Sequence, residues 1–375
     1  MVEIKQITSS KKDLKRFTKF QLDLYDGNPY YVPPLISDDV DTLNPLKNPA
    51  FDFCESAYFM AFRDGKPVGR IAGILNHKVN EKDNSKTVRF GFIDFIDDRE
   101  VSAALLKAVE DWGREKGMKK IIGPLGFTDM DHEGMLIQGF DELSTMATIY
   151  NYPYYPEHME AHGYVKDSDW VEFLMEVPDG IPEKYNRIAD IVKKKFGLRV
   201  LKYSSRSRIK NEYGRALFHL INDSYKDLYQ YSPLSDRQIE HYIDIYLGLL
   251  NLDLVTLIVD KEDKLVGVGI SMPSMSRALQ KSRGRLLPFG WIDLLKGLKG
   301  KNDRVDLLLV AVKPEYMNKG VNALLFQDLI PYYIKYGYRY AESNPEMESN
   351  AKVQGQWEYF AHRQHRRRRS YQKKL

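Results

Sequence analysis

Cysteine is nearly absent from this chain: Cys54 is the only one among 375 residues. A single thiol excludes a disulfide scaffold and a cysteine-rich zinc site, and it is typical of a reducing compartment. Uncharged apolar runs of about 18 residues are also missing, so the sequence predicts no membrane-spanning helix. The N-terminus MVEIKQITSSKKDLKR lacks the apolar core that a secretory signal needs. We therefore expect a cytoplasmic protein, with a peripheral association with the inner membrane left open.

A strong net charge is missing as well, because the 56 Lys and Arg residues are nearly balanced by 52 Asp and Glu residues. Two segments are nevertheless strongly basic, namely 277–301 and 362–375. Such segments favour an anionic partner: a phosphate-bearing cofactor, a membrane surface or a nucleic acid. The run Arg366–Arg369 fits an anion-binding patch and equally the outer face of a final strand. Since no motif of a nucleic-acid-binding domain accompanies this run, we do not expect nucleic acid as a partner.

The length of the chain suggests two domains, and its two halves show the same order of elements. Each half is predicted to contain a strand, a helix, a hairpin and then alternating strands and helices. This order predicts a mixed α/β fold with two tandem lobes, each a mixed twisted sheet flanked by helices. We expect the first lobe at 1–177, a linker at 178–197 and the second lobe at 198–375. The end of the chain is predicted as a helix over 350–363 and a last strand near 368–374.

The most specific motif lies at 305–336, which reads VDLLLVAVKPEYMNKGVNALLFQDLIPYYIKY. A strand ends in V-x-P-x-Y, and a loop with a central glycine then opens a helix. This segment resembles the central motif of the GNAT superfamily of N-acyltransferases, in which the loop reads [RQ]-x-x-G-x-[GA]. Met317 stands where the family has Arg or Gln, and Asn322 where it has Gly or Ala. The positions that match the motif are Val312, Pro314, Tyr316 and Gly320.

The resemblance implies an acyl-coenzyme A co-substrate and no metal. In the family, the loop amides and the helix N-terminus hold the pyrophosphate, and the strand end pairs with the pantetheine amides. The amide of Val312 is expected to hold the oxygen of the thioester carbonyl. Asn350 resembles a later family element near the same ligand. The remaining predicted coenzyme A residues are Val310, Met317, Asn318, Lys319, Gly320 and Asn322.

Two features depart from the family pattern. Trp357 occupies the place of a tyrosine that protonates the leaving thiolate, and Tyr359 lies nearby. In the first half, Arg99-Glu100 follows the corresponding strand without a glycine-rich loop, so we expect this lobe not to bind coenzyme A.

The whole chain, through the segment GPLGFTDMDHEGMLIQGF, resembles tandem-lobe GNAT-like proteins of Bacteroidetes and Proteobacteria. Their relatives include enzymes implicated in bacterial ceramide synthesis. This implies an N-acyltransferase that uses a primary amine, with a lipid or long-chain amine as one option.

Polar side chains gather at 128–133, after the predicted strand 119–124. His132 or Glu133 is a candidate to take a proton from an amine, and Glu342 is a third candidate for this base. A loop whose side chains satisfy backbone amides has the same composition, so this interpretation also stays open.

Further residues are candidates for binding the acceptor. Asp129 or Asp131 is a candidate to orient the base or to hold a substrate ammonium group. Tyr150 and Tyr152 are candidates to line the acceptor pocket, or they are packed with one end in water.

Apolar and basic residues alternate between 283 and 301. This composition is typical of a helix that lies on an anionic lipid surface, so peripheral membrane contact through 283–301 is one prediction. A lid over an acyl-chain channel, or a segment packed on the first lobe, are the alternatives. For the function as a whole, the alternative to an enzyme is a non-catalytic module that binds acyl-coenzyme A or lipid.

Overall fold

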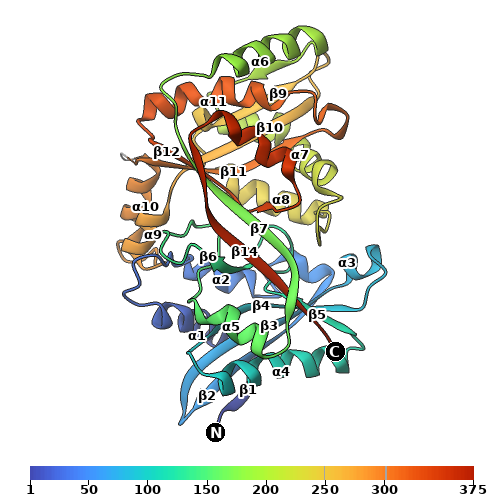
Figure 1. Ribbon diagram of the computed structural model, residues 1–375, viewed down its shortest axis with the longest axis vertical. Coiled ribbons are helices and arrows are strands. Elements are labelled where there is room, and N and C mark those ends of the chain that lie inside the picture. The colour runs from blue at the N-terminus through green and yellow to red at the C-terminus, as the bar shows by residue number, and fades with distance from the viewer. Residues whose placement is uncertain (249, 300–301) are drawn as a thin grey trace.

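One mixed sheet of 14 strands runs through both halves of the protein (Figure 1). The computed structural model describes residues 1–248, 250–299 and 302–375. No helix within these ranges has both the length and the apolar character needed to cross a bilayer. Helices flank the sheet, so the predicted mixed α/β architecture is confirmed.

The first half follows the predicted order of a strand, a helix and a hairpin. The hairpin turns at Asp64 and Gly65, which both adopt left-handed backbone angles. The strands are β1 (Glu3–Ile7), β2 (Cys54–Arg63), β3 (Lys66–Asn76), β4 (Thr87–Phe95), β5 (Lys120–Gly123), β6 (Met135–Gln138) and β7 (Val165–Glu176). The helices are α1 (Lys11–Leu24), α2 (Ile36–Thr42), α3 (His77–Lys82), α4 (Arg99–Glu115) and α5 (Tyr154–Ala161).

The second half repeats this order and adds two helices between its hairpin and the strand that follows. The strands are β8 (Arg199–Leu201), β9 (Val255–Val259), β10 (Leu265–Pro273), β11 (Arg304–Val312), β12 (Tyr340–Ser343), β13 (Glu346–Met347) and β14 (His362–Lys374). The helices are α6 (Glu183–Phe196), α7 (Arg206–Tyr225), α8 (Asp236–Tyr246), α9 (Ser276–Ser282), α10 (Gly290–Lys299), α11 (Asn322–Tyr336) and α12 (Ala351–Gln354).

The segment 178–197, expected as the linker, contains the whole of α6, whose apolar side packs against α11. One sequence prediction fails in this half. The expected helix over 350–363 is wrong beyond its first turns. Only α12 and a short 3-10 turn at Gly355–Tyr359 are helical, and β14 begins at His362.

The last strand joins the two halves. The strand order is β1-β2-β3-β4-β5-β14-β7-β12-β11-β10-β9-β8. β14 therefore pairs with β5 and β7 of the first half, while β7 pairs with β12 of the second. Figure 1 shows β7 and β14 side by side where the sheet passes from one lobe to the other. The lobe boundaries stay a prediction, and the sheet is continuous across them.

Helices cover both faces of the second lobe's sheet. Along β9, Leu257 packs with α7 and α8, whereas the next residue, Ile258, packs with α6 and α11. Successive strand residues point to opposite faces, so these clusters are two separate cores. A ligand that binds beside α11 is therefore on the other face of the sheet from α7 and α8.

Candidate active site

Two neighbouring strands part in the middle of the second lobe. β11 and β12 run parallel and pair over four residues, up to Leu307 on β11. β11 then continues to Val312 beside β10, so its other edge is open. The backbone N–H and C=O groups of successive strand residues point alternately to the two edges of the strand. The Lys313 N–H donates to β10, so the backbone groups of Val310 and Val312 point to the other edge, into the opening. Their carbonyls accept hydrogen bonds from hydroxyls at the end of α7, at 2.7 and 2.9 Å, and their N–H groups face the same opening.

The loop between β11 and α11 has the shape of an anion site. Asn318 and Gly320 adopt left-handed backbone angles, with φ of 60° and 81°. Val321 is the N-cap of α11, and no side chain of the described residues caps this end of the helix. Lys319 is exposed on the same loop. Free amides at such a turn and at a helix N-terminus attract a phosphate group, and the lysine adds a positive charge.

Three predicted coenzyme A residues make contacts of their own. Met317 is 38% exposed on the loop. The Asn322 amide donates to Gln356 at 3.1 Å and so links α11 to the segment after α12. Asn350 is the N-cap of α12. A role for these residues in binding a ligand stays a prediction.

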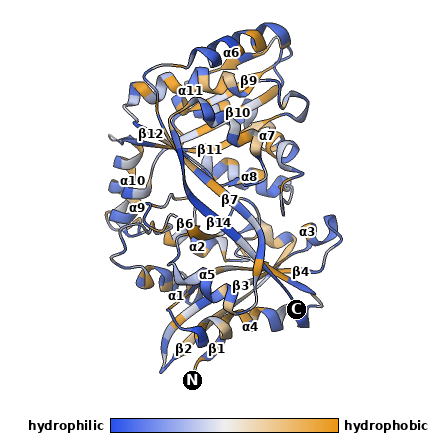
Figure 2. Cartoon of the chain, viewed as in Figure 1, coloured by the Kyte–Doolittle hydropathy of each residue, from blue (hydrophilic) through white to orange (hydrophobic). Residues whose placement is uncertain are grey.

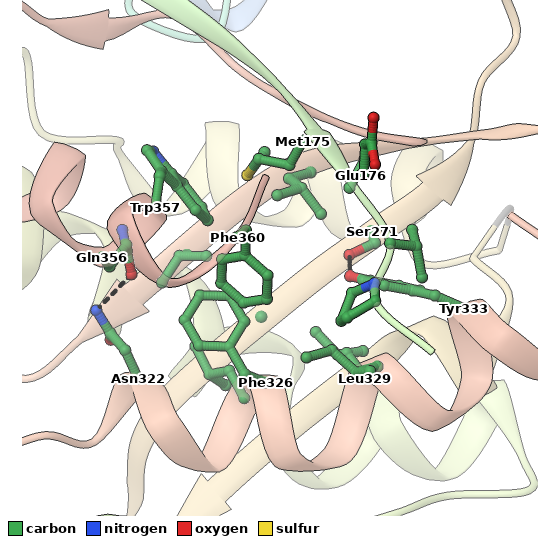
Figure 3. A pocket seen from close by; sticks show the side chains of 18 of the residues that line it. Met175, Glu176, Ser271, Asn322, Phe326, Leu329, Tyr333, Gln356, Trp357 and Phe360 are labelled. Atoms are coloured by element: carbon green, nitrogen blue, oxygen red, sulfur yellow. Dashed lines mark hydrogen bonds between the residues drawn. The ribbon is translucent and has the colours of Figure 1, made fainter. Parts of the chain in front are cut away.

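An apolar pocket lies between α11 and the sheet (Figure 3). Its cavity volume is about 50 Å³. It extends along α11 from Asn322 to Tyr333, which is about 16 Å at 1.5 Å per residue. Phe326 and Leu329 lie between these ends and point into the pocket. Other lining residues are Met175, Gly269, Ser271, Leu307, Val310, Ala341, Trp357 and Phe360.

Two buried acids lie on the opposite face of the same strands. Asp306 and Glu342 are partners across β11 and β12. Each adjoins a pocket-lining residue in sequence, so both point away from the pocket. The Asp306 oxygens have no hydrogen-bond partner among the described residues, and burial beside Glu342 raises the pKa of Asp306 to about 8. Burial also raises the pKa of Glu342. The opening therefore has an apolar pocket on one face and a proton-binding pair on the other.

Two arginines of β14 are buried beside these acids, in a strand that Figure 2 shows as hydrophilic in the middle of the sheet. Arg366 donates to Glu172 at 2.7 Å and also to Glu342, and Arg368 donates to Glu172. Burial alone would raise the pKa of Glu172, but the two guanidinium groups hold it below its usual value. The prediction of an exposed strand face or patch at Arg366–Arg369 is wrong for these two residues, because both are fully buried.

The same cluster contains a buried histidine. Ligand atoms of Glu172, Glu342 and His365 lie within 4.8 Å of one another, which is close enough for a metal ion. Burial lowers the pKa of His365 to about 3, so the ring is neutral at pH 7. Arg366 and Arg368 already neutralise the two carboxylates, and their charges would oppose a cation. This geometry therefore disfavours a metal site.

Proteins of known structure share this arrangement of strands and helices. A tandem GNAT protein from the clavulanic acid biosynthesis pathway superposes with a TM-score of 0.56 at 13% identity, covering 100% of this chain and 98% of its own. The chain has a tandem GNAT fold. An N-acetyltransferase of the same superfamily from Sphaerobacter thermophilus gives a TM-score of 0.51 at 11% identity, covering 100% of this chain and 95% of its own. The resemblance stated from the motif at 305–336 is thus confirmed at the level of the fold.

Two curated proteins match most of this chain in sequence. Protein YghO of Escherichia coli (strain K12) is 28% identical over 372 residues, which are 98% of this chain and 94% of that protein. A bacterial ceramide synthase of Caulobacter vibrioides is 29% identical over 315 residues, which are 82% of this chain and 80% of that protein. No protein-family model matches the chain.

The polar loop 128–133 lies where the two lobes of the tandem GNAT fold meet. Asp129 accepts a hydrogen bond from the Ser232 N–H at 3.2 Å, and Asp131 accepts one from the Thr128 N–H at 3.0 Å. Burial raises the pKa of both aspartates to about 6, and burial also raises the pKa of Glu133 well above its usual value. Three carboxyl groups thus share one loop at the lobe junction, and a role in binding the acceptor amine stays a prediction.

His132 and Glu342 are each close to a different arginine of β14. The His132 ring bonds to the Met146 carbonyl oxygen at 3.0 Å, and burial lowers the pKa of His132 to about 4. Arg368 lowers this pKa further, whereas Arg366 binds Glu342. A neutral histidine with so low a pKa is a weak base. A role for His132 or Glu342 as the base stays a prediction.

The corresponding opening of the first lobe is filled by the protein's own side chains. β4 and β5 pair over Thr87–Arg89 and then part. Beyond this point the Phe95 N–H donates to the Tyr155 hydroxyl at 3.0 Å, and the Phe95 carbonyl accepts from Tyr154 at 2.6 Å. Asp98 caps the N-terminus of α4. The prediction that the first lobe does not bind coenzyme A stays a prediction.

Tyr150 and Tyr152 belong to an aromatic cluster beside that filled opening. Their rings lie 5.6 and 5.0 Å from the ring of Tyr25. The Tyr150 hydroxyl donates to the Phe140 carbonyl at 3.2 Å, and the Tyr152 hydroxyl donates to the Leu24 carbonyl at 3.4 Å. These contacts favour packing over an acceptor pocket, and their role in binding a substrate stays a prediction.

Sequence reasoning missed Asp306 and the pocket along α11. One signal for Asp306 is present in the sequence, because it is the only acid in the apolar strand VDLLLVAV that carries the motif. An acid in such a strand is rarely buried without a reason. The pocket has no comparable signal, since its residues are ordinary core residues spread over several elements.

Proposed function

We propose that the protein is an N-acyltransferase that moves an acyl group from a coenzyme A thioester to a primary amine. The observation that carries this proposal is the opening between β11 and β12. The open edge at Val310 has an apolar pocket on one face and the Asp306–Glu342 pair on the other. A donor and an acceptor that enter from opposite faces would meet at this edge.

The residues around the opening fit a coenzyme A thioester. The uncapped N-terminus of α11, the left-handed loop and Lys319 suit its phosphates. The N–H groups of Val310 and Val312 suit carbonyl oxygens of the pantetheine arm and of the thioester. The thioester supplies an activated acyl carbon, and the pocket between α11 and the sheet holds the acyl chain.

The acids on the other face suit the amine. An amine must lose a proton before it attacks, and a buried carboxylate with a raised pKa is a stronger base than one in water. We infer that the Asp306–Glu342 pair takes this proton. Holding both substrates at the open edge supplies the remaining rate acceleration.

We further propose a long-chain donor and a lipid or long-chain amine as the acceptor. The apolar lining, which follows α11 from Asn322 to Tyr333, favours a long acyl chain. The sequence similarity to a protein named bacterial ceramide synthase favours the same substrate class.

A second candidate is a non-catalytic module that binds acyl-coenzyme A or lipid. The side chain of Trp357 favours it, because this residue stands in place of the family's acid and its indole N–H donates to Glu346 at 3.0 Å. Tyr359 bonds to Lys184 and is 44% exposed, outside the pocket lining. In the catalytic alternative, solvent protonates the leaving thiolate.

Calorimetric titration with acetyl-coenzyme A and palmitoyl-coenzyme A tests the donor site. Gly320 is a poor position for a variant, because a Cβ there would lie 2.8 Å from Ile188 of α6 and a left-handed φ would strain any other residue. Lys319→Glu is better, since Lys319 is exposed. This variant should bind palmitoyl-coenzyme A at least about tenfold more weakly, which is about 1.4 kcal/mol in binding free energy. Lys15→Glu, an exposed lysine of the first lobe, is the matched control.

Product analysis separates the two candidate functions. The wild type is incubated with palmitoyl-coenzyme A and dodecylamine, and the amide is measured by mass spectrometry. Amide formation that depends on enzyme concentration supports the transferase. Tight binding of palmitoyl-coenzyme A without amide would support the binding module, and absence of binding would contradict both.

A further inference from the structure

The two helices inserted between β10 and β11 carry an exposed apolar tip. α9, α10 and the loop between them, residues 276–299, are here called the insertion. Leu287 and Phe289 of its loop are 76% and 71% exposed. Trp291 and Leu295, four residues apart and therefore on one side of α10, are 48% and 44% exposed. These residues form a continuous apolar tip from the loop onto the outer side of α10.

Folding of the insertion does not explain this tip. The inner side of α10 is already packed, because Leu294 and Leu298 belong to one apolar cluster with Met275, just before α9, and Leu279 of α9. α9 and α10 also approach each other closely at Gly297, where a Cβ would lie 2.9 Å from Ala278. The outer apolar side of α10 is therefore left over after the core is complete. Exposed apolar patches of this kind mark surfaces that bind a partner or a membrane.

The charges around the tip favour an anionic surface. Arg285, Lys296 and Lys299 are exposed, and none of them forms an ion pair with a carboxylate in the part of the chain that the structure describes. The acid of α10, Asp293, is already paired with Lys281 at 2.7 Å. Apolar side chains that enter a bilayer beside free cations match the boundary between anionic headgroups and acyl chains.

We propose that the insertion docks on an anionic lipid bilayer, with Leu287, Phe289 and Trp291 entering the headgroup region. This inference rests on the proposed function in one respect only: the reason for docking would be that the membrane delivers the lipid amine. The inner side of α10 belongs to one apolar cluster with Met272 of β10 and Leu308 of β11. Leu308 lies two residues after Asp306 and on the same face of the sheet. An apolar cluster thus connects the helix that carries the tip to the strand that carries Asp306.

Sedimentation with lipid vesicles tests the docking directly. The wild-type protein should bind vesicles of phosphatidylcholine and phosphatidylglycerol, and added salt should weaken this binding. It should bind phosphatidylcholine vesicles far less. The double variant Leu287→Asp with Phe289→Asp should lose at least about tenfold in binding to the mixed vesicles. Lys296→Glu with Lys299→Glu should lose binding to a similar extent.

Two controls keep the result interpretable. Leu46→Asp changes an 86% exposed leucine outside the insertion and should leave vesicle binding unchanged. All variants should keep the wild-type unfolding midpoint and the wild-type affinity for palmitoyl-coenzyme A. Failure of the wild type to bind coenzyme A thioesters, with vesicle binding retained, would contradict the proposed function and leave the docking intact.

Two outcomes would overturn the docking. One is full vesicle binding by the Leu287→Asp, Phe289→Asp variant. The other is a wild type that does not bind vesicles but forms a dimer in sedimentation velocity that the same variant dissociates. That second result would assign the tip to another copy of the chain.

Discussion

Asp306 shows how the surroundings of one residue determine its chemistry. Its side chain is 1% exposed, and Glu342 faces it from the next strand. Burial and this like charge raise its pKa from 3.8 to about 8. Between these two values an unfolded chain releases the proton that the folded protein retains. Asp306 therefore lowers the stability of the fold as the pH rises from about 4 to about 8.

Asp306→Asn should separate stability from activity. The neutral amide has nearly the same volume, so the variant should be more stable than the wild type at pH 8 by at least about 1 kcal/mol, since one pKa unit is 1.4 kcal/mol. The difference should vanish near pH 4. Amide formation should fall at least about a hundredfold if Asp306 belongs to the base. Thermal unfolding at both pH values and product analysis measure the two effects. A variant that loses both stability and activity at pH 8 would contradict this assignment.

The buried arginines allow a second prediction at this scale. Arg366→Met removes a positive charge that neutralises the buried carboxylates of Glu172 and Glu342. Because a buried charge without a partner is costly, we expect a loss of about 3–5 kcal/mol in the free energy of unfolding. Arg363→Met is the matched control, because Arg363 is half exposed and pairs with Glu142 at the surface. It should cost about 1 kcal/mol or less. Urea denaturation measures both, and equal losses in the two variants would show that the buried cluster is not special.

At the scale of elements, β11 and α11 could be predicted from the sequence because their signals are local. An apolar strand, a proline, a glycine in a loop and an apolar helix follow one another without interruption. β14 could not be predicted in the same way. Its alternating buried residues include Arg366 and Arg368, which hydropathy assigns to the surface. The acid that neutralises them, Glu172, lies more than 190 residues away in sequence.

The candidate site was predictable to a similar extent. The motif indicates the loop around Lys319 and the strand end at Val310, since both lie within one short segment. Asp306 gains its raised pKa from Glu342, which only the parallel pairing of β11 and β12 brings opposite it. The pocket along α11 depends on residues from several strands and on the segment after α12. Such a site arises from packing, and periodicity within one segment does not report it.

The pocket leads to a prediction about α11. Leu329 points into its middle, so Leu329→Trp should fill the space that an acyl chain would occupy. Palmitoyl-coenzyme A should bind at least about tenfold more weakly, because overpacking costs about 1–3 kcal/mol. Acetyl-coenzyme A, which does not reach that far, should be affected less than about threefold. Ile334→Trp, on the exposed side of the same helix, is the control in the same titrations. Equal losses for both thioesters would indicate that the acyl chain lies elsewhere.

At the scale of the whole molecule, the sheet makes the two lobes one folding unit. β14 lies between β5 and β7 and pairs with β7 from His362 to Gln372. β7, in turn, reaches the second lobe through β12. Each lobe therefore contains a strand that the other lobe needs. A sheet joined in this way should unfold in one transition.

Cutting the chain between Asp179 and Gly180 tests this unity. The cut falls at an exposed turn before α6, so it breaks no strand. The fragment 1–179 lacks β14, which leaves edges of β5 and β7 unpaired and the acids of β7 without their arginines. Expressed alone, it should be unfolded or aggregated. Expressed together, 1–179 and 180–375 should purify as a one-to-one complex with the circular dichroism spectrum of the intact protein. A folded, monomeric 1–179 fragment would contradict the prediction, because the first lobe would then not need β14 to complete its sheet.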